Sequence, residues 1–226
     1  FSLIYFALTL IIAGIIRATV WATYFQKQNK SIRNWRFDIE YAKSLLKNVW
    51  PLIISGLSVA VYMKIDQVML KSMVNANAVG NYSVAVTISQ LWYFIPLTIT
   101  SSVFPSIIQS KKENIKKYYR RLQYLYDVMT TIAIAIALPM TFLSDFVILT
   151  LFGPEYTQAG AVLAIHIWAG VFVFLGVVRS RWIINENYQF YGMIFTISGA
   201  IVNIIMNSWL IPIYGILGAA WATLIS

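Results

Sequence analysis

Residues 159–178 read AGAVLAIHIWAGVFVFLGVV and contain no Asp, Glu, Lys or Arg. A helix of about 20 apolar residues crosses the hydrocarbon core of a bilayer, which is about 30 Å thick. Inside that core every backbone N–H and C=O group must be bonded within the protein, so a spanning segment forms a helix or joins a closed barrel. The stretch lacks the alternating pattern of a barrel strand. It therefore predicts a membrane-spanning helix.

Similar apolar stretches recur along the whole chain. Hydrophobic residues make up 59% of the sequence and charged residues 11%, and the mean hydropathy is +0.70. These values lie outside the range of soluble globular domains. Six complete spans and part of a seventh are predicted, at about residues 2–25, 50–71, 82–109, 124–147, 159–180, 189–211 and from 215 onward. The expected fold is an all-α, polytopic bundle of transmembrane helices.

The positive charges are distributed unevenly between the loops. The net charge is +9, from 17 Lys and Arg against 8 Asp and Glu. The first, third and fifth loops hold Lys27, Lys30, Arg33, Arg36, Lys43, Lys47, Lys111, Lys112, Lys116, Lys117, Arg120, Arg121, Arg179 and Arg181, whereas the alternate loops hold only Lys71. By the positive-inside rule, these three loops face the cytoplasm. Because the cations lie in loops between spans, nucleic acid is not an expected partner.

The residue types that carry covalent chemistry are scarce. The chain has no cysteine and a single histidine, His166, which is expected to be a hydrogen-bonded core residue. It has no phosphate-binding glycine loop, no nucleophile motif and no carboxylate pair at catalytic spacing. Asp127 lies close to Arg120 and Arg121, where an ordinary ion pair is expected. The sequence therefore predicts a protein that is not an enzyme and has neither a cofactor nor a metal site.

Three charged residues remain inside predicted spans. Arg17 and Lys64 would each cost about 2.5 to 3.5 kcal/mol at the centre of a span, so each needs a partner, a polar cavity or a route to the interface. Asp66 shares a helical face with Tyr62 and Ser58. This polar stripe is either a packing contact between helices or a cavity wall. In a cavity wall, Asp66 would couple to a proton or cation, or hold a basic residue in place.

Uncharged polar residues also occur at membrane depth. Asn203 and Asn207 are four residues apart and therefore share one face of a predicted helix. Gln90 lies in the third predicted span with Thr87 on the same side. Close packing and a hydrophilic lumen both explain such residues, and packing is the simpler explanation for the asparagine pair.

Several strings, in this order, resemble the O-antigen and polysaccharide flippases of the multidrug/oligosaccharidyl-lipid/polysaccharide exporter superfamily. They are WPL at 50–52, KIDQVML at 64–70, VGNYSVA at 79–85, FPSI at 104–107, LFGPEY at 151–156 and LIPIYGILGAAWAT at 210–223. No single string is specific, but their order and spacing are. The resemblance covers residues 50 to 226.

The resemblance implies a twelve-helix transporter made of two six-helix bundles, of which this chain is a fragment from the C-terminal half. Residues 1–25 would be the last transmembrane helix of the first bundle. Residues 26–48 would be a basic cytoplasmic linker, and residues 49–226 the second bundle with its last helix truncated. A bacterial inner membrane is the implied location.

The resemblance also implies a substrate, a polyprenyl-pyrophosphate-linked oligosaccharide that is flipped across the membrane by alternating access. Arg17 and Lys64 would then stabilise the anionic head group, and Asp66 would position groups or couple to an ion. Gln90, Asn203 and Asn207 would form hydrogen bonds with sugar or backbone. Membrane lipids, a coupling proton or cation and a polysaccharide polymerase or other assembly protein are the implied partners.

Two alternatives remain open. A drug or cation antiporter of the same superfamily would favour an acidic cavity without much positive charge. A membrane protein of polysaccharide assembly without transport activity, such as a polymerase or a scaffold, is the other. A polymerase is expected to place reactive residues in a large extracytoplasmic loop, and the predicted outer loops are short.

Overall fold

The computed structural model describes residues 3–27 and 37–226, except for the side chains of residues 3–7 and 10. The chain divides into two compact units, Phe1–Asn48 and Val49–Ser226, and each is described by itself. In the first unit, α1 (Leu3–Lys27) is a helix of 25 residues. A rise of about 1.5 Å per residue makes it long enough to cross a bilayer. Within the linker expected at 26–48, residues 28–36 lie outside the described residues.

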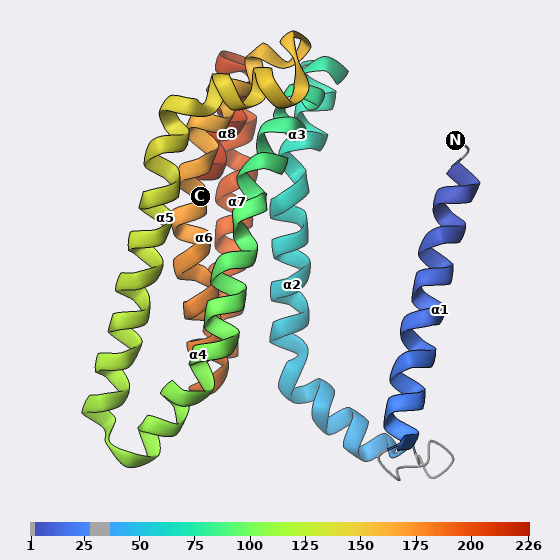
Figure 1. Cartoon of the computed structure of the whole chain (residues 1–226), viewed down its shortest axis with the longest axis vertical. Coiled ribbons are helices and arrows are strands. Elements are labelled where there is room, and N and C mark those ends of the chain that lie inside the picture. The colour runs from blue at the N-terminus through green and yellow to red at the C-terminus, as the bar shows by residue number, and fades with distance from the viewer. Residues whose placement is uncertain (1–2, 28–36) are drawn as a thin grey trace. The chain divides into compact units, whose positions relative to one another are not determined.

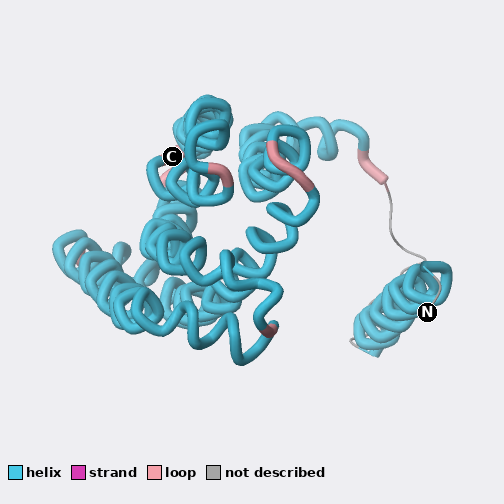
Figure 2. The backbone as a smooth tube through the Cα atoms, turned by 90° about the horizontal axis from the view of Figure 1, so that it is seen from above, coloured by secondary structure: helices cyan, strands magenta, loops and turns pink. Residues whose placement is uncertain are grey.

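Helix α2 (Ile39–Met73) begins in the first unit and continues into the second. Asp38 stabilises its start, because the Asp38 carboxylate accepts the backbone N–H groups of Glu40 and Tyr41 at 2.9 and 3.0 Å. The elements that follow are α3 (Ala76–Gln90), η2 (Leu91–Tyr93), α4 (Phe94–Glu113), α5 (Ile115–Phe152), η3 (Pro154–Tyr156), α6 (Thr157–Asn185), α7 (Gln189–Tyr214) and α8 (Ile216–Ile225). Figure 2 shows how short the loops between them are.

The predicted all-α, polytopic fold is confirmed. Five helical stretches of the described residues are long and apolar enough to cross a membrane, namely Ile39–Met73, Ala76–Glu113, Ile115–Phe152, Pro154–Asn185 and Gln189–Tyr214. No β-strand occurs in the ranges 3–27 and 37–226. Each helical stretch extends beyond the span predicted from hydropathy, because a helix can continue into the polar interface where the apolar signal stops.

The stretch Ala76–Glu113 is interrupted near its middle. Leu91–Tyr93 form a single 3₁₀ turn between α3 and α4. Pro96 has no N–H group to donate to the carbonyl of Trp92 four residues earlier, which removes one backbone hydrogen bond of a regular helix at this point. The 3₁₀ turn lies one turn before the proline itself.

Helix α6 forms the centre of the second unit. It packs against α3, α4, α5 and α8, and in Figure 1 it lies between α5 and α7. Its buried residues occur along most of its length and are Ala159, Gly160, Val162, Leu163, His166, Ile167, Ala169, Gly170, Phe174, Val178 and Ile183. Large apolar side chains are exposed on neighbouring helices, for example Phe142, Phe146 and Trp209. An outer surface of this kind suits lipid as the solvent.

Helices α7 and α8 approach each other closely at the turn that joins them. Gly215 has φ 58° and ψ −129°, a backbone conformation that L residues rarely adopt. Its N–H group donates to the carbonyl of Ile211 at 2.8 Å. A Cβ atom at Gly218 would overlap with the backbone of Leu210. The two glycines therefore fix how α8 lies along α7.

A polar clasp joins two turns at one end of the helices. Lys111, near the end of α4, forms an ion pair with Glu186 at 2.6 Å in the turn between α6 and α7. The buried Tyr118 donates to the same carboxylate at 2.8 Å, and Asn185 donates to it at 3.1 Å. These hydrogen bonds from Lys111 and Tyr118 lower the pKa of Glu186 below its ordinary value. We call these four residues the Glu186 clasp.

Candidate functional site

Three hydrogen-bond donors from three helices converge on the carboxylate of Asp66 in α2. Tyr82 of α3 and Thr223 of α8 place their hydroxyl oxygens 2.6 and 2.7 Å from Oδ2 of Asp66. The Asn207 amide of α7 donates to Oδ1 at 2.6 Å. Asp66 is 4% exposed and Asn207 is fully buried. The carboxyl group of Asp66 therefore links α2, α3, α7 and α8 through hydrogen bonds.

Further polar groups surround this centre. The Asn203 carbonyl oxygen accepts from the Asn207 amide at 3.1 Å, and Asn203 is itself fully buried. The Tyr62 hydroxyl donates to the backbone carbonyl of Thr223 at 2.9 Å. We call Tyr62, Asp66, Tyr82, Asn203, Asn207 and Thr223 the Asp66 cluster.

Helical spacing explains how four of these side chains meet. Tyr62 and Asp66 are four residues apart on α2, so both face α8. Asn203 and Asn207 have the same spacing on α7, and the amide of one bonds the carbonyl of the other. Thr223 lies on α8, which the turn at Gly215 brings back against α7. The cluster therefore depends on the packing of α7 and α8 as much as on α2.

The cluster contains an acidic group without a basic partner. Among the residues that the structure describes, no Lys, Arg or His lies within ion-pair distance of Asp66. The carbonyl oxygen of Asn207 is buried and accepts no hydrogen bond from any residue in the described part of the chain. Burying an uncompensated carboxylate is costly, and the cost is relieved by a bound proton or cation. Carboxylate, amide and hydroxyl oxygens are also ligands that hard cations prefer.

Comparison with known proteins places the chain in a family. A family model described as "Polysaccharide biosynthesis protein" matches residues 2–161, which is more than half of the chain. The chain belongs to this polysaccharide biosynthesis family. The resemblance to polysaccharide flippases that the sequence motifs indicate is thereby confirmed.

Two curated relatives of this family member come from the archaeon Haloferax volcanii. One, named "Probable flippase AglR", is 29% identical over 174 residues, which cover 73% of this chain and 35% of the relative. The other, named "Probable low-salt glycan biosynthesis flippase Agl15", is 23% identical over 220 residues, or 96% of this chain and 45% of the relative. The chain thus spans less than half the length of either relative. No solved structure matches it.

The names of both relatives describe transporters. This agrees with the prediction that this polysaccharide biosynthesis protein is not an enzyme. The family match and the five apolar helical stretches together make it a multi-pass membrane protein of a polysaccharide biosynthesis family.

The structure brings three of the six predicted site residues together. Asp66, Asn203 and Asn207 all belong to the Asp66 cluster. Lys64 is exposed on the apolar side of α2, where Val61 and Val68 are its neighbours. Gln90 is half-buried at the end of α3 and forms no hydrogen bond with the cluster in the described part of the chain. Arg17 is exposed on α1, in the first unit.

Two members of the cluster were not predicted from the sequence. Tyr82 and Thr223 occur in the motif strings at 79–85 and 210–223, but nothing in those strings distinguishes them as partners of Asp66. Their partner lies 16 and 157 residues away along the chain. Such contacts depend on how helices pack, and hydropathy and helical spacing do not report on that packing.

Two other polar residues of this family member were predicted to be structural. His166 is 4% exposed, and its Nδ1 atom lies 2.9 Å from the hydroxyl of Ser89 on α3. The prediction of a hydrogen-bonded core histidine is confirmed. The ion pair predicted between Asp127 and Arg120 or Arg121 is wrong, because the partner of Asp127 is the amide of Gln123 at 2.8 Å. Arg121 instead donates to the backbone carbonyl of Ser106 at 3.3 Å.

Proposed function

We propose that this protein moves a polyprenyl-pyrophosphate-linked oligosaccharide across a membrane, and that the Asp66 cluster binds the proton or small cation that drives this movement. The family match and the flippase relatives support the substrate class. The single observation behind the ion site is the buried Asp66 carboxylate, which has three hydrogen-bond donors but no cationic partner among the described residues.

A bound positive charge at Asp66 would change the hydrogen bonds between helices. Tyr82, Thr223 and Asn207 donate to the carboxylate, so a proton or cation there would compete with them for its oxygens. Those donors belong to α3, α8 and α7. An ion shifts a conformational equilibrium only by the difference between its affinities for the two conformations. If the three donors move away from Asp66 in one of the two conformations, the ion competes with them only in the other conformation. Its affinity for the two conformations then differs.

Lys64, Arg17 and Gln90 keep the roles expected from the resemblance, whereas Asn203 and Asn207 are reassigned from sugar binding to the ion site. Lys64 and Arg17 are exposed and available to an anionic pyrophosphate group. A charged side chain on an apolar helix face is expensive in lipid, which supports a functional reason for each. Gln90 is proposed to form a hydrogen bond with sugar, and Asn203 and Asn207 to belong to the ion site.

The architecture of the whole protein is also part of the proposal. We infer two six-helix bundles that open alternately to either side, with residues 1–25 in the first bundle, 26–48 as a basic cytoplasmic linker and 49–226 in the second. We infer a bacterial inner membrane from the motifs, whereas both Haloferax volcanii relatives are archaeal. A polysaccharide polymerase is the proposed assembly partner.

A drug or cation antiporter of the same superfamily is the second candidate. A buried carboxylate without a counter-charge would suit it equally well, and this single observation keeps it in consideration. The family match and the glycan-related name of one relative favour the glycan substrate.

The test is complementation of a host that lacks its own lipid-linked glycan flippase, with surface glycan as the readout. The full-length protein would be compared with its Asp66→Asn, Lys64→Gln and Arg17→Gln variants at matched expression. Asp127→Asn is the matched control, because Asp127 is an exposed carboxylate on α5. We expect the wild type and Asp127→Asn to restore glycan, and Asp66→Asn to fail.

The other outcomes separate the candidates. Drug resistance without surface glycan would support the antiporter. Restored glycan with Asp66→Asn would agree with the flippase proposal but contradict the proposed ion site at Asp66. Restored glycan in both the Lys64 and Arg17 variants would remove the proposed cationic path.

A further inference from the structure

The hairpin between α4 and α5 concentrates positive charge. Residues 111–121 read KKENIKKYYRR and contain six Lys and Arg against the single carboxylate of Glu113. These residues lie at the end of two helical stretches that are apolar enough to cross a membrane. The hairpin therefore lies where a helix leaves the lipid core.

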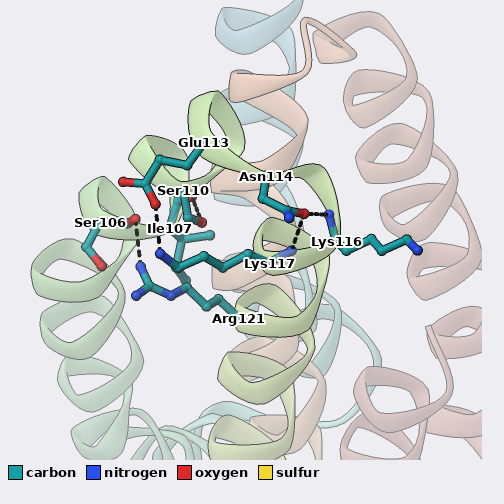
Figure 3. Close-up of polar contacts among 8 residues, drawn as sticks. All are labelled: Ser106, Ile107, Ser110, Glu113, Asn114, Lys116, Lys117 and Arg121. Carbon is teal, nitrogen blue, oxygen red and sulfur yellow. Dashed lines mark hydrogen bonds and ion pairs between the residues drawn. The ribbon is translucent and has the colours of Figure 1, made fainter.

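Asn114 fixes the geometry of this hairpin. It is the one residue between the two helices and has an extended backbone, with φ −159° and ψ 120°. Its side-chain oxygen accepts the backbone N–H groups of Lys116 and Lys117 at 2.8 and 3.3 Å, as Figure 3 shows. This is an N-cap, and it starts α5 directly after α4 ends. The six cations therefore lie on a tight corner between α4 and α5.

Three of the six cations form an ion pair or a hydrogen bond with another residue of the protein. Lys111 forms the ion pair of the Glu186 clasp. Lys117 forms an ion pair with Glu113 at 2.7 Å, one helical turn away. Arg121 donates to the backbone carbonyl of Ser106 at 3.3 Å, and Figure 3 shows it reaching across from α5 to α4. We call Lys111, Lys117 and Arg121 the committed cations.

The other three, Lys112, Lys116 and Arg120, are the free cations. All three are exposed, and their side chains form no hydrogen bond or ion pair with any residue that the structure describes. With 3.6 residues per turn, Lys116 and Arg120 share the face of α5 opposite the buried Tyr118 and Leu122. They therefore point away from the protein core.

Aromatic side chains accompany the free cations. Tyr119 is 54% exposed and Tyr124 is 71% exposed, and both lie on the same stretch of α5. Tyrosine favours the level of the lipid headgroups, because its ring is apolar and its hydroxyl is polar. Exposed tyrosine next to Lys and Arg at the end of an apolar helix is the composition of a surface that contacts headgroups.

We propose that Lys112, Lys116 and Arg120 bind the phosphates of anionic lipids in the leaflet at this end of the helices. Lys and Arg at a membrane surface are attracted to anionic headgroups. The committed cations have protein oxygens as partners, whereas the free cations have none and face outward. Because Lys116 and Arg120 lie on an exposed face of α5 and Lys112 is exposed on α4, the free cations suit a layer of laterally mobile headgroups better than one enclosed soluble anion.

Because three of the six cations are free and three are committed, two variants with equal charge loss can be compared. One variant replaces the free cations (Lys112→Gln, Lys116→Gln, Arg120→Gln), and the other replaces the committed cations (Lys111→Gln, Lys117→Gln, Arg121→Gln). Both lose three charges from the same hairpin, so net charge and the topological signal of the loop change equally. The measurement is retention of phosphatidylglycerol, relative to phosphatidylcholine, by the purified full-length protein in native mass spectrometry.

In the free-cation variant, the retention of phosphatidylglycerol relative to phosphatidylcholine is expected to fall roughly fivefold for each charge removed. The committed-cation variant is expected to keep it. Equal losses in both variants would mean that only net charge matters, and that result would overturn the proposal. So would an unchanged preference in the free-cation variant.

Two controls complete the experiment. Inorganic pyrophosphate is added to the wild type, and displacement of phosphatidylglycerol by this soluble anion at equal concentration would show that the strip binds free phosphates instead. Thermal unfolding of each variant checks that it is folded. If either triple variant does not fold, the double variant Lys116→Gln with Arg120→Gln is compared with the double variant Lys117→Gln with Arg121→Gln, which also loses two charges.

Discussion

At the scale of single residues, the hydrogen bonds to Asp66 determine what each donor contributes. A buried group that loses its partner costs more than the average hydrogen bond is worth, because the group left behind is still desolvated. Thr223 and Thr100 allow this to be measured with one type of substitution. Both are buried, but the hydroxyl of Thr223 bonds Asp66, whereas the hydroxyl of Thr100 has no partner within residues 3–27 and 37–226.

Thr223→Val is expected to destabilise the protein by about 1–3 kcal/mol, because it removes a donor from a buried carboxylate. Thr100→Val, the matched control, is expected to be neutral or stabilising, because it removes a hydroxyl that is buried without a partner. Thermal unfolding of the purified variants measures both effects. A Thr100→Val protein as unstable as Thr223→Val would contradict the hydrogen-bond network at Asp66.

Residue spacing predicted part of the cluster. Asp66, Asn203 and Asn207 could be found because each is a polar residue inside an apolar span, and the asparagine pair also has helical spacing. Tyr82 and Thr223 could not be found, since tyrosine and threonine are common in such helices and only the packing of α3 and α8 brings them to Asp66. Lys64, two residues from Asp66, faces a different side of the same helix and is not part of the cluster.

At the scale of elements, the contact between α7 and α8 positions Thr223. Gly218→Ala places a methyl group against the Leu210 backbone, which cannot move without shifting the helix. We expect a loss of about 1–3 kcal/mol, the usual cost of overpacking. Gly176→Ala, inside α6 with nothing near its added methyl group, is the matched control and is expected to change stability little. Equal stability of the two variants in thermal unfolding would argue against the close approach of α7 and α8.

The Glu186 clasp gives the stability of the protein a dependence on pH. The pKa of Glu186 is lowered from 4.5 mainly by the hydrogen bonds from Lys111, so its carboxylate is ionised more readily in the folded protein than in the unfolded chain. The resulting stability is fully present above pH 4.5 and is lost as pH falls through the lowered pKa. Because the clasp is partly exposed, its contribution is about 1 kcal/mol.

Glu186→Gln is therefore expected to be less stable than the wild type at neutral pH, and this difference is expected to shrink as pH falls below 4.5. Unfolding temperatures measured across this range give the difference directly. Glu113→Gln is the control, because Glu113 pairs with Lys117 at an exposed position within one turn. A stability difference for Glu186→Gln that is constant with pH would contradict the ionised clasp.

Element boundaries show which signals the sequence contains. Hydropathy located the five apolar stretches from residue 50 onward, because lipid selects for apolar side chains along their whole length. It did not reveal that α2 begins at Ile39, because the first part of that helix carries Glu40, Lys43 and Lys47. The 3₁₀ turn at Leu91–Tyr93 lies just before Pro96, whose missing N–H group is the local signal for it.

At the scale of the whole molecule, the chain is an all-α membrane protein of a polysaccharide biosynthesis family. Its matched relatives are more than twice as long as the aligned region, so the activity of the complete protein is a proposal. The Asp66 cluster lies entirely within Val49–Ser226. The proposed coupling to a proton or cation can therefore be tested at Asp66 without assuming how the two units are arranged.

The most direct test of this coupling is transport by the full-length protein in proteoliposomes, with a polyprenyl-pyrophosphate-linked oligosaccharide as the substrate. Proton and sodium gradients are imposed separately on the wild type, Asp66→Asn and Asp127→Asn. We predict that one of the gradients accelerates translocation by the wild type and by Asp127→Asn, and that folded Asp66→Asn does not respond. Equal acceleration of Asp66→Asn would contradict the account, because the carboxylate on which α3, α7 and α8 converge would then not be the coupling group.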